Sequence, residues 1–123
     1  MDDQEIAKLT AFHGRFAAAI ESTSQMPISG GSFTVLEGAI SMKCMSIPIS
    51  ITYHPIEEAD HTGLKYIFFK GYESGQPIIL ELFLGPNGLC TDSLNGTDFA
   101  ALDDSALARK IIFAVSDRLA SGK

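Results

Sequence analysis

The sequence LKYIFFKGYESGQPIILELFL, residues 64–84, contains two runs that are apolar on both faces, 64–70 and 78–84. Strands that are covered on two sides have continuous apolar runs of this kind, so both runs are predicted to be central strands of a sheet. The glycines and the proline in GYESGQP between them are typical of a turn. Because a short polar connection favours antiparallel neighbours, we predict an antiparallel pair at the centre of the fold.

The segment before this pair alternates with a period of two. In IPISITYH, residues 47–54, isoleucines and a tyrosine alternate with polar residues, which predicts a strand with one buried and one solvated face. Pro48 cannot donate to a ladder, so the start of this strand is expected at an edge or a bulge. Residues 33–46 also have an extended pattern, with a bulge or bend at Gly38. This pattern does not decide between one bent strand and two short ones.

After residue 84 the chain reverses and then becomes helical. GPNG at 85–88 predicts a tight turn, and LCTD at 89–92 predicts a short returning strand. Apolar residues at steps of three and four predict amphipathic helices at both ends of the chain. The two stripes are Ile6, Leu9, Phe12, Phe16 and Ile20, ending by about Ser24, and Leu107, Ile111, Ala114, Val115 and Leu119.

Together these elements predict an α+β fold in a single domain of residues 1–123. We expect a five- or six-stranded antiparallel meander sheet bracketed by an N-terminal and a C-terminal helix. Both helices must bury an apolar stripe, and the sheet offers the apolar face that can receive them. Two helices cover one face of the two apolar central strands, so the remaining sheet surface predicts a homodimer or a complex with another protein.

The charge of the chain limits its partners. Fifteen acidic and nine basic residues give a formal net charge of -6, which repels phosphate backbones and anionic lipids. We therefore expect no nucleic acid and no membrane as partners, and a partner protein with a basic surface is compatible with this sign. The acidic start, with Asp2, Asp3 and Glu5, is the opposite of a basic secretory signal and predicts a cytoplasmic protein.

The stretch HPIEEADHTG, residues 54–63, concentrates histidines and carboxylates. Imidazole and carboxylate groups are competent zinc or manganese ligands. However, His54 and His61 are seven residues apart, and this spacing matches no established zinc motif. We predict a charged hairpin loop here and assign no metal ligand.

Other catalytic patterns are absent from the sequence. The cysteines, Cys44 and Cys90, form no CxxC pair and are predicted to be buried small hydrophobic residues. No glycine-rich phosphate loop is present, so no cofactor is expected. Aspartates between 92 and 104 lack the calcium-loop register, and turns and helix caps explain them better. We therefore assign no catalytic residue and favour a non-catalytic protein.

The remaining candidate for function is a surface. Flexible methionines beside an incompletely paired sheet edge can receive a partner by repacking or by strand addition, although such methionines also fill cores. The predicted partner-binding residues are Met42, Met45, Ile47, Ser50, Thr52 and His54. We expect a protein-binding module that acts through an apolar sheet face or edge, in the manner of a secretion chaperone, an immunity protein or an inhibitor.

An alternative from a different class stays open. A strongly curved sheet can enclose a pocket, which would make the chain a small enzyme or a ligand carrier. His54 and His61, with Glu57 or Glu58, would then lie at the mouth of that pocket.

Overall fold

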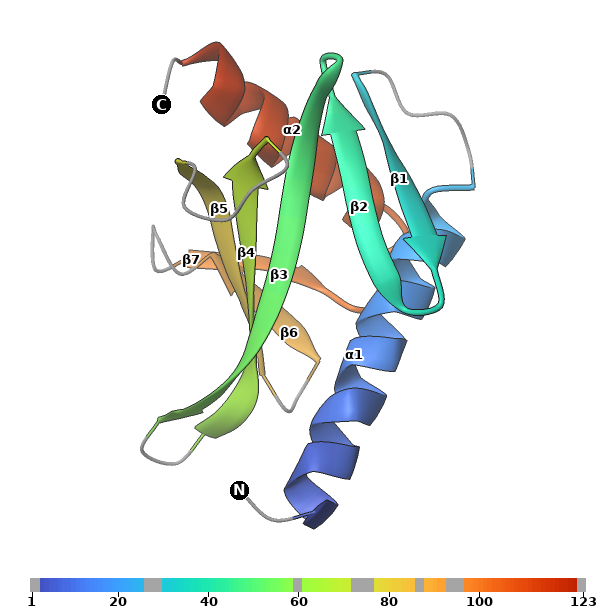
Figure 1. The fold of residues 1–123 in the computed structure, drawn as a ribbon, viewed down its shortest axis with the longest axis vertical. Helices are drawn as coiled ribbons and strands as arrows, with labels where there is room; N and C mark the ends of the chain where they lie inside the picture. The colour runs from blue at the N-terminus through green and yellow to red at the C-terminus, as the bar shows by residue number, and fades with distance from the viewer. Residues whose placement is uncertain are drawn as a thin grey trace.

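The computed structural model describes residues 3–25, 30–58, 61–71, 77–85, 88–92 and 97–121. Seven strands form one antiparallel sheet in which each strand neighbours the next one in the sequence (Figure 1). The strands are β1 (Gly31–Leu36), β2 (Ala39–Cys44), β3 (Ile47–Glu58), β4 (His61–Lys70), β5 (Ile78–Leu84), β6 (Leu89–Asp92) and β7 (Thr97–Ala101).

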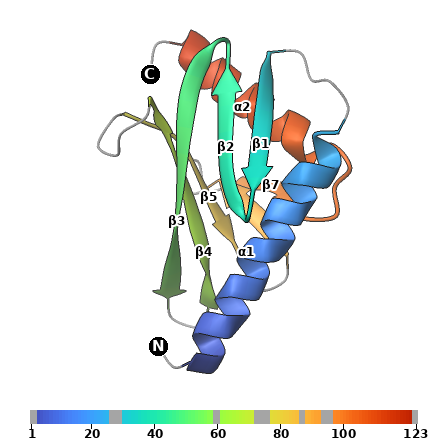
Figure 2. The same ribbon diagram turned by 45° about the vertical axis from the view of Figure 1, so that its right-hand side comes forward.

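Two helices bracket the sheet, as predicted: α1 (Asp3–Thr23) and α2 (Leu107–Ala120). The sheet curls, and both helices pack against its inner face and against each other (Figure 2). α2 contacts β1 and β2 at one side of the sheet and β5 and β7 at the other. The core therefore lies between the helices and the concave face of the sheet.

Most of the apolar stripe of α1 lies in this core, whereas Ile6 at its start is exposed. Leu9, Phe16 and Ile20 are buried, and they follow one another at helical spacing along the face that meets the sheet. The helix ends close to the predicted position, where the N–H of Ser24 donates to the carbonyl oxygen of Ile20 at 3.0 Å. Burial of this stripe fixes the position of α1 against the sheet.

The two apolar runs at 64–70 and 78–84 become the antiparallel neighbours β4 and β5, as predicted. Their inward side chains, among them Tyr66 and Leu82, are fully buried. Their outward side chains are more polar than the sequence suggests, because Lys65 on β4 and Glu81 on β5 form an ion pair with an N–O distance of 2.9 Å. The outward surface of this pair is therefore mixed, and not continuously apolar.

The predicted strand number of five or six is wrong by one or two. The segment 33–46 forms two strands, because Glu37 and Gly38 adopt positive φ angles of 51° and 82° and close a two-residue hairpin between β1 and β2. β7 was also missed, because its residues follow a stretch rich in aspartate, asparagine and glycine that is typical of loops.

Arg118 links the C-terminal helix to the sheet. Arg118 on α2 donates to the Asp92 carboxylate at 2.6 Å and to the carbonyl oxygen of Ile79 at 2.9 Å. Asp92 is almost completely buried. This arrangement joins α2 to β5 and β6 and keeps that side of the curl closed.

Candidate functional site

The sheet opens between β2 and β3. The two strands pair only from Met42 and Ile49 to the turn, although β3 continues as far as Glu58 and β2 begins at Ala39. Figures 1 and 2 both show the strands meeting at their shared turn and separating away from it. The part of the sheet between β2 and β3 is therefore a V with its apex at Met42 and Ile49.

The turn at the apex fixes the direction of the backbone groups. Met45 and Ser46 both have positive φ, 51° and 66°, as a two-residue hairpin turn requires. Pro48 directs its carbonyl oxygen towards the β4 side, where it accepts the N–H of Gly71 at 2.8 Å. Because backbone groups alternate along an antiparallel strand, the N–H and C=O groups of Ile51 and Tyr53 point into the opening.

A cavity of about 490 Å³ lies over this opening. Its walls carry hydroxyl groups from three strands, and its floor is aliphatic. The residues that line it are Ser32, Thr34, Ile40, Ser41, Met42, Lys43, Pro48, Ile49, Ser50 and Ile51. Between the apex and the wide end, about three residues of each strand face the opening, a length of about 10 Å. We call this cavity the β2–β3 groove.

His13 of α1 closes the wide end of the groove. Its ring stacks on Tyr53 of β3 with a centroid distance of 4.0 Å, and its Nε2 lies 2.5 Å from the carbonyl oxygen of Gly38 at the tip of the β1–β2 hairpin. Since a carbonyl oxygen only accepts, Nε2 carries the proton. A helix side chain thus stands between β3 and the hairpin tip.

The other ring nitrogen of His13 completes a buried chain of hydrogen bonds. Nδ1 lies 2.8 Å from the hydroxyl of Tyr66, which donates to it when Nε2 holds the ring proton. Burial raises the pKa of Tyr66 above its ordinary value of 10.0, so the phenol keeps its proton. The chain runs from Tyr66 through His13 to Gly38 and anchors the hairpin tip to the core.

The six residues predicted to bind a partner surround the apex and one arm of the groove. Of these six, Met42 and Ser50 line it, while Met45 lies in the apical turn with 47% of its surface exposed. Ser50 donates from its hydroxyl to the carbonyl oxygen of Gly71 at 2.5 Å. Of the others, Ile47 is half-buried, and Thr52 and His54 lie on the outward face of β3 with 3.3 Å between their side chains.

The stretch HPIEEADHTG was predicted to be a loop, and this prediction is wrong for most of its length. β3 extends to Glu58, β4 begins at His61, and these two residues are paired. His54 pairs with Lys65, four register positions from His61, so the two histidines are about 13 Å apart along the hairpin. That separation is too large for one metal ion. The predicted roles of Glu57, Glu58 and His61 fall on side chains outside the described ones.

The two cysteines lie in the core, as predicted. Burial raises the pKa of Cys90 to about 12, so its thiol stays protonated at neutral pH. Cys44 is fully buried, with its sulfur 2.8 Å from the hydroxyl of Ser116. Over the described residues, no three His, Cys, Asp or Glu side chains come together as metal ligands would.

Two of the clustered aspartates have structural roles. Asp104 accepts the N–H of Ala106 at 2.8 Å and pairs with Lys110, so it caps the turn that leads into α2. Asp92 binds Arg118. The prediction that turns and caps explain this cluster is confirmed at Asp104, while Asp98 lies outside the described side chains.

Sequence reasoning missed the role of His13. In the sequence it is one polar residue beside the apolar stripe of a helix, and only the fold brings it between Gly38 and Tyr53. The available signal was the position of His13 between Leu9 and Phe16, which places it on the buried side of α1.

Comparisons with known proteins add no further constraint. Family models, curated proteins and solved structures were searched, and none matches the chain. Within the described ranges, neither α1 nor α2 is long and apolar enough to span a membrane.

Proposed function

We propose that this protein binds an extended segment of another protein in the β2–β3 groove. The observation that carries this proposal is the ladder between β2 and β3, which stops at Met42 and Ile49 while both strands continue. Backbone N–H and C=O groups are strong hydrogen-bonding groups, and a second backbone satisfies a row of them best. Strand addition of this kind takes its affinity from main-chain bonds and its specificity from side-chain pockets.

The exposed apolar side chains support this location. Leu36, Met45 and Tyr53 are 70%, 47% and 47% exposed, and they lie at the hairpin tip, at the apex and at the wide end of β3. They therefore surround the groove at its corners. A bound segment would cover apolar surface around the groove while its backbone pairs inside it.

The outward face of β4 and β5 is the weaker candidate for a contact surface. Ile67 and Phe83 are half-buried there, and the ion pair of Lys65 with Glu81 lies between the same strands. The homodimer stays a prediction on this surface. Light scattering after size-exclusion chromatography, over a range of concentrations, measures whether the mass doubles.

A ligand pocket is the second proposal. An apolar groove of about 140 Å³ lies between the first half of α1 and β3, lined by Ile6, Leu9, Thr10, Tyr53, Pro55 and Leu64. A volume of this size accepts only a small apolar group, because binding sites for drug-sized ligands are usually 300 Å³ or larger. The larger, hydroxyl-lined β2–β3 groove therefore supports the protein-binding proposal better.

Peptide selection tests the leading proposal. Phage-displayed random ten-residue peptides are selected on the protein, and their affinities are then measured for two variants. Ser41→Trp fills the groove from an exposed position in its wall, and Ser105→Trp makes the same change at an exposed position outside it. We expect selected peptides to bind Ser41→Trp at least about tenfold more weakly and Ser105→Trp with unchanged affinity.

A spectroscopic readout locates the bound peptide. Titration should shift the backbone amide resonances of Ile40, Ile51 and Tyr53 most strongly. Selection of no peptide, equal affinity for both variants, or shifts confined to α2 would contradict the proposal.

A further inference from the structure

The β2–β3 groove has a local charge opposite to that of the whole chain. The protein carries a formal net charge of -6, yet Lys43 is the charged residue that lines the groove, and no carboxylate lines it among the described residues. Lys43 is exposed and lies opposite Pro48, at the apex. An anionic group that enters the groove therefore meets a cation first.

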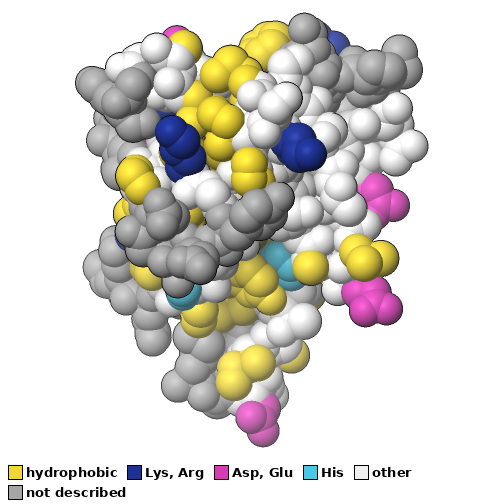
Figure 3. Space-filling view, turned by 45° about the horizontal axis from the view of Figure 1, so that its top comes forward, with side chains coloured by type: hydrophobic (Ala, Val, Ile, Leu, Met, Phe, Trp, Pro, Cys, Tyr) yellow, Lys and Arg dark blue, Asp and Glu magenta, His cyan; other side chains and the backbone are white. Residues whose placement is uncertain are grey.

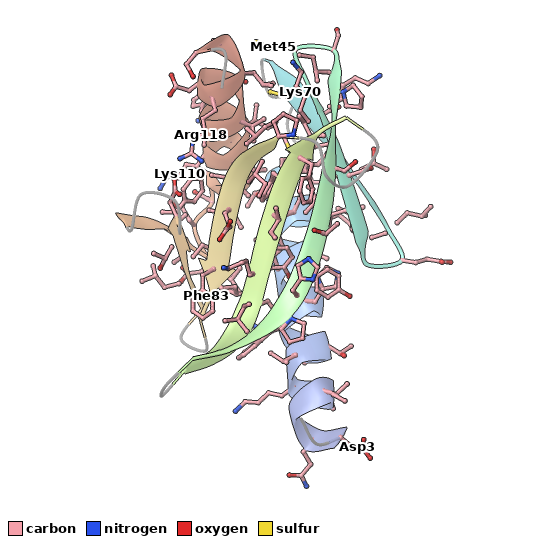
Figure 4. All side chains as sticks on the ribbon, turned by 60° about the vertical axis from the view of Figure 1, so that its left-hand side comes forward. Asp3, Met45, Lys70, Phe83, Lys110 and Arg118 are labelled. Carbon is pink, nitrogen blue, oxygen red and sulfur yellow. The ribbon has the colours of Figure 1, made fainter. Side chains whose placement is uncertain are left out.

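A second lysine lies at the same end. Lys70 is exposed and directly precedes Gly71, whose N–H binds the carbonyl oxygen of Pro48, so its backbone adjoins the apex. Figure 4 shows Lys70 and Met45 at one end of the molecule and Asp3 at the opposite end. Within the described part of the chain, neither Lys43 nor Lys70 forms an ion pair. Both lysines therefore place positive charge near the apex that no described carboxylate pairs with.

The surface around the apex combines positive charge with apolar side chains. Figure 3 shows Lys or Arg side chains on either side of an apolar area on this face, with the described Asp and Glu side chains along its margin. Glu37 lies at the other end of the groove, beside Gly38 in the hairpin tip. The lysines thus lie at the apex of the groove, while Glu37 lies outside its lining, at the hairpin tip beyond the wide end.

The two walls and the floor define which side chains fit. A strand in the groove would direct alternate side chains inward and outward. Inward side chains would meet aliphatic residues such as Ile40, Ile49 and Ile51, and outward side chains would meet hydroxyl groups and Lys43. Hydroxyl groups donate to carboxylates, and lysine attracts them.

We infer that the segment bound in the β2–β3 groove alternates aliphatic residues with Asp or Glu, and that one of its acidic side chains lies beside Lys43 at the apex. This inference rests on the proposed function and adds the chemistry of the partner. It also reverses the expectation from the net charge, which pointed to a basic partner. The local charge of the groove determines the preferred partner more than the net charge does. At 0.1 M salt, screening limits the reach of an exposed charge to about 10 Å.

Three synthetic peptides test the inference. Fluorescein-labelled nine-residue peptides alternate Val with Glu, Val with Gln and Val with Lys, and fluorescence anisotropy measures their affinities in 50 mM NaCl. We expect the Glu peptide to bind about tenfold more tightly than the Lys peptide, with the Gln peptide between them. The difference should shrink in 500 mM NaCl, because salt screens exposed charges.

Charge-reversal variants connect the preference to the groove. Lys43→Glu should abolish or reverse the preference for the Glu peptide. Lys8→Glu, the same change at an exposed position near the start of α1, should preserve it. Both positions are exposed, so both variants should fold.

The possible results distinguish failure of the acidic specificity from failure of the proposed function. Equal binding of all three peptides, or tighter binding of the Lys peptide, would overturn the acidic specificity and leave the proposed function in place. A preference for the Glu peptide that Lys43→Glu retains would also overturn it, since the charge would then act elsewhere. If none of the three peptides binds and the phage selection also yields none, the proposed function itself fails.

Discussion

The sheet is built differently on the two sides of β3. Towards β4, a continuous ladder runs from Ser50 to Glu58, and Tyr66, Phe68 and Leu82 fill the core behind it. Towards β2, pairing stops after three residues, and a helix side chain, His13, contacts the hairpin tip in place of a ladder. One side of the same strand is therefore paired along most of its length, and the other side is unpaired beyond Ile49, where we propose that a partner binds.

Under the proposed function, one strand would combine stability on one side with binding on the other. Edge strands with free backbone groups risk aggregation, and proteins limit them by short length, charge or coverage. Here the unpaired stretch of β2 is three residues long, 39–41, with Lys43 at the apex on one side and the His13 contact to the hairpin tip on the other. The short unpaired length of β2 limits the edge that would be exposed if, as we propose, the opening binds a segment.

The largest expected effect comes from core truncation on the closed side. Phe68 on β4 is fully buried, and Phe68→Ala should lower the free energy of unfolding by about 3–5 kcal/mol. Phe33 on β1 is half-buried, so Phe33→Ala should cost less than half as much. Urea unfolding measures both variants. Equal losses would contradict the comparison, because the hairpin would then be packed as tightly as the centre of the sheet.

The His13 chain should have the next largest effect. His13→Phe keeps an aromatic ring against Tyr53 but leaves the buried Tyr66 hydroxyl without its acceptor, which should cost about 1–3 kcal/mol. Tyr66→Phe made in that background removes the stranded hydroxyl and should recover part of the loss. A double-mutant cycle measures the coupling. Additive losses would show that the two side chains act independently.

The two cysteine thiols report local opening on the two sides of β3. Cys44 lies on β2 beside the apex, whereas Cys90 lies on β6, where burial raises its pKa to about 12. Burial keeps the Cys90 thiol protonated at pH 8, so iodoacetamide should modify it very slowly. We expect Cys44 to be modified first, through local opening of the hairpin, as measured by mass spectrometry over time. Faster modification of Cys90 would contradict this expectation, because the region around β6 would then open more easily than the β1–β2 hairpin.

The smallest effect is expected at the start of α2, which both sides share. The hydrogen bond from Lys110, with that from the N–H of Ala106, holds the pKa of Asp104 below its ordinary value of 3.8. A lowered folded-state pKa contributes stability above pH 3.8, and this contribution is lost as the pH falls through the folded value. Melting temperatures at pH 2–6 should therefore depend slightly less on pH in Asp104→Asn than in the native protein. Identical curves would contradict this role.

The sequence predicts local structure well where the periodicity is strong. The stripes of both helices and the apolar runs of β4 and β5 each indicate one element, and each element is present with most of those residues buried. The strand LCTD and the turn before it follow in the same way from glycine positions. These features depend on neighbours within a few residues.

The groove could not be predicted from the same patterns. The residues predicted to bind a partner, between Met42 and His54, lie around the groove, but period-two alternation does not show where a ladder stops. That depends on His13, 25 residues before Gly38 and 40 before Tyr53 in the sequence. The opening is a tertiary feature, because a helix residue and two strands must meet before it exists.

Amide hydrogen exchange along β3 tests the open ladder most directly. In the free protein, Thr52 and His54, whose groups face β4, should exchange slowly, while Ile51 and Tyr53, whose groups face the opening, should exchange fast. A bound peptide should then protect Ile51 and Tyr53. Slow exchange at all four amides of the free protein would contradict the account, because β3 would then be paired on both sides.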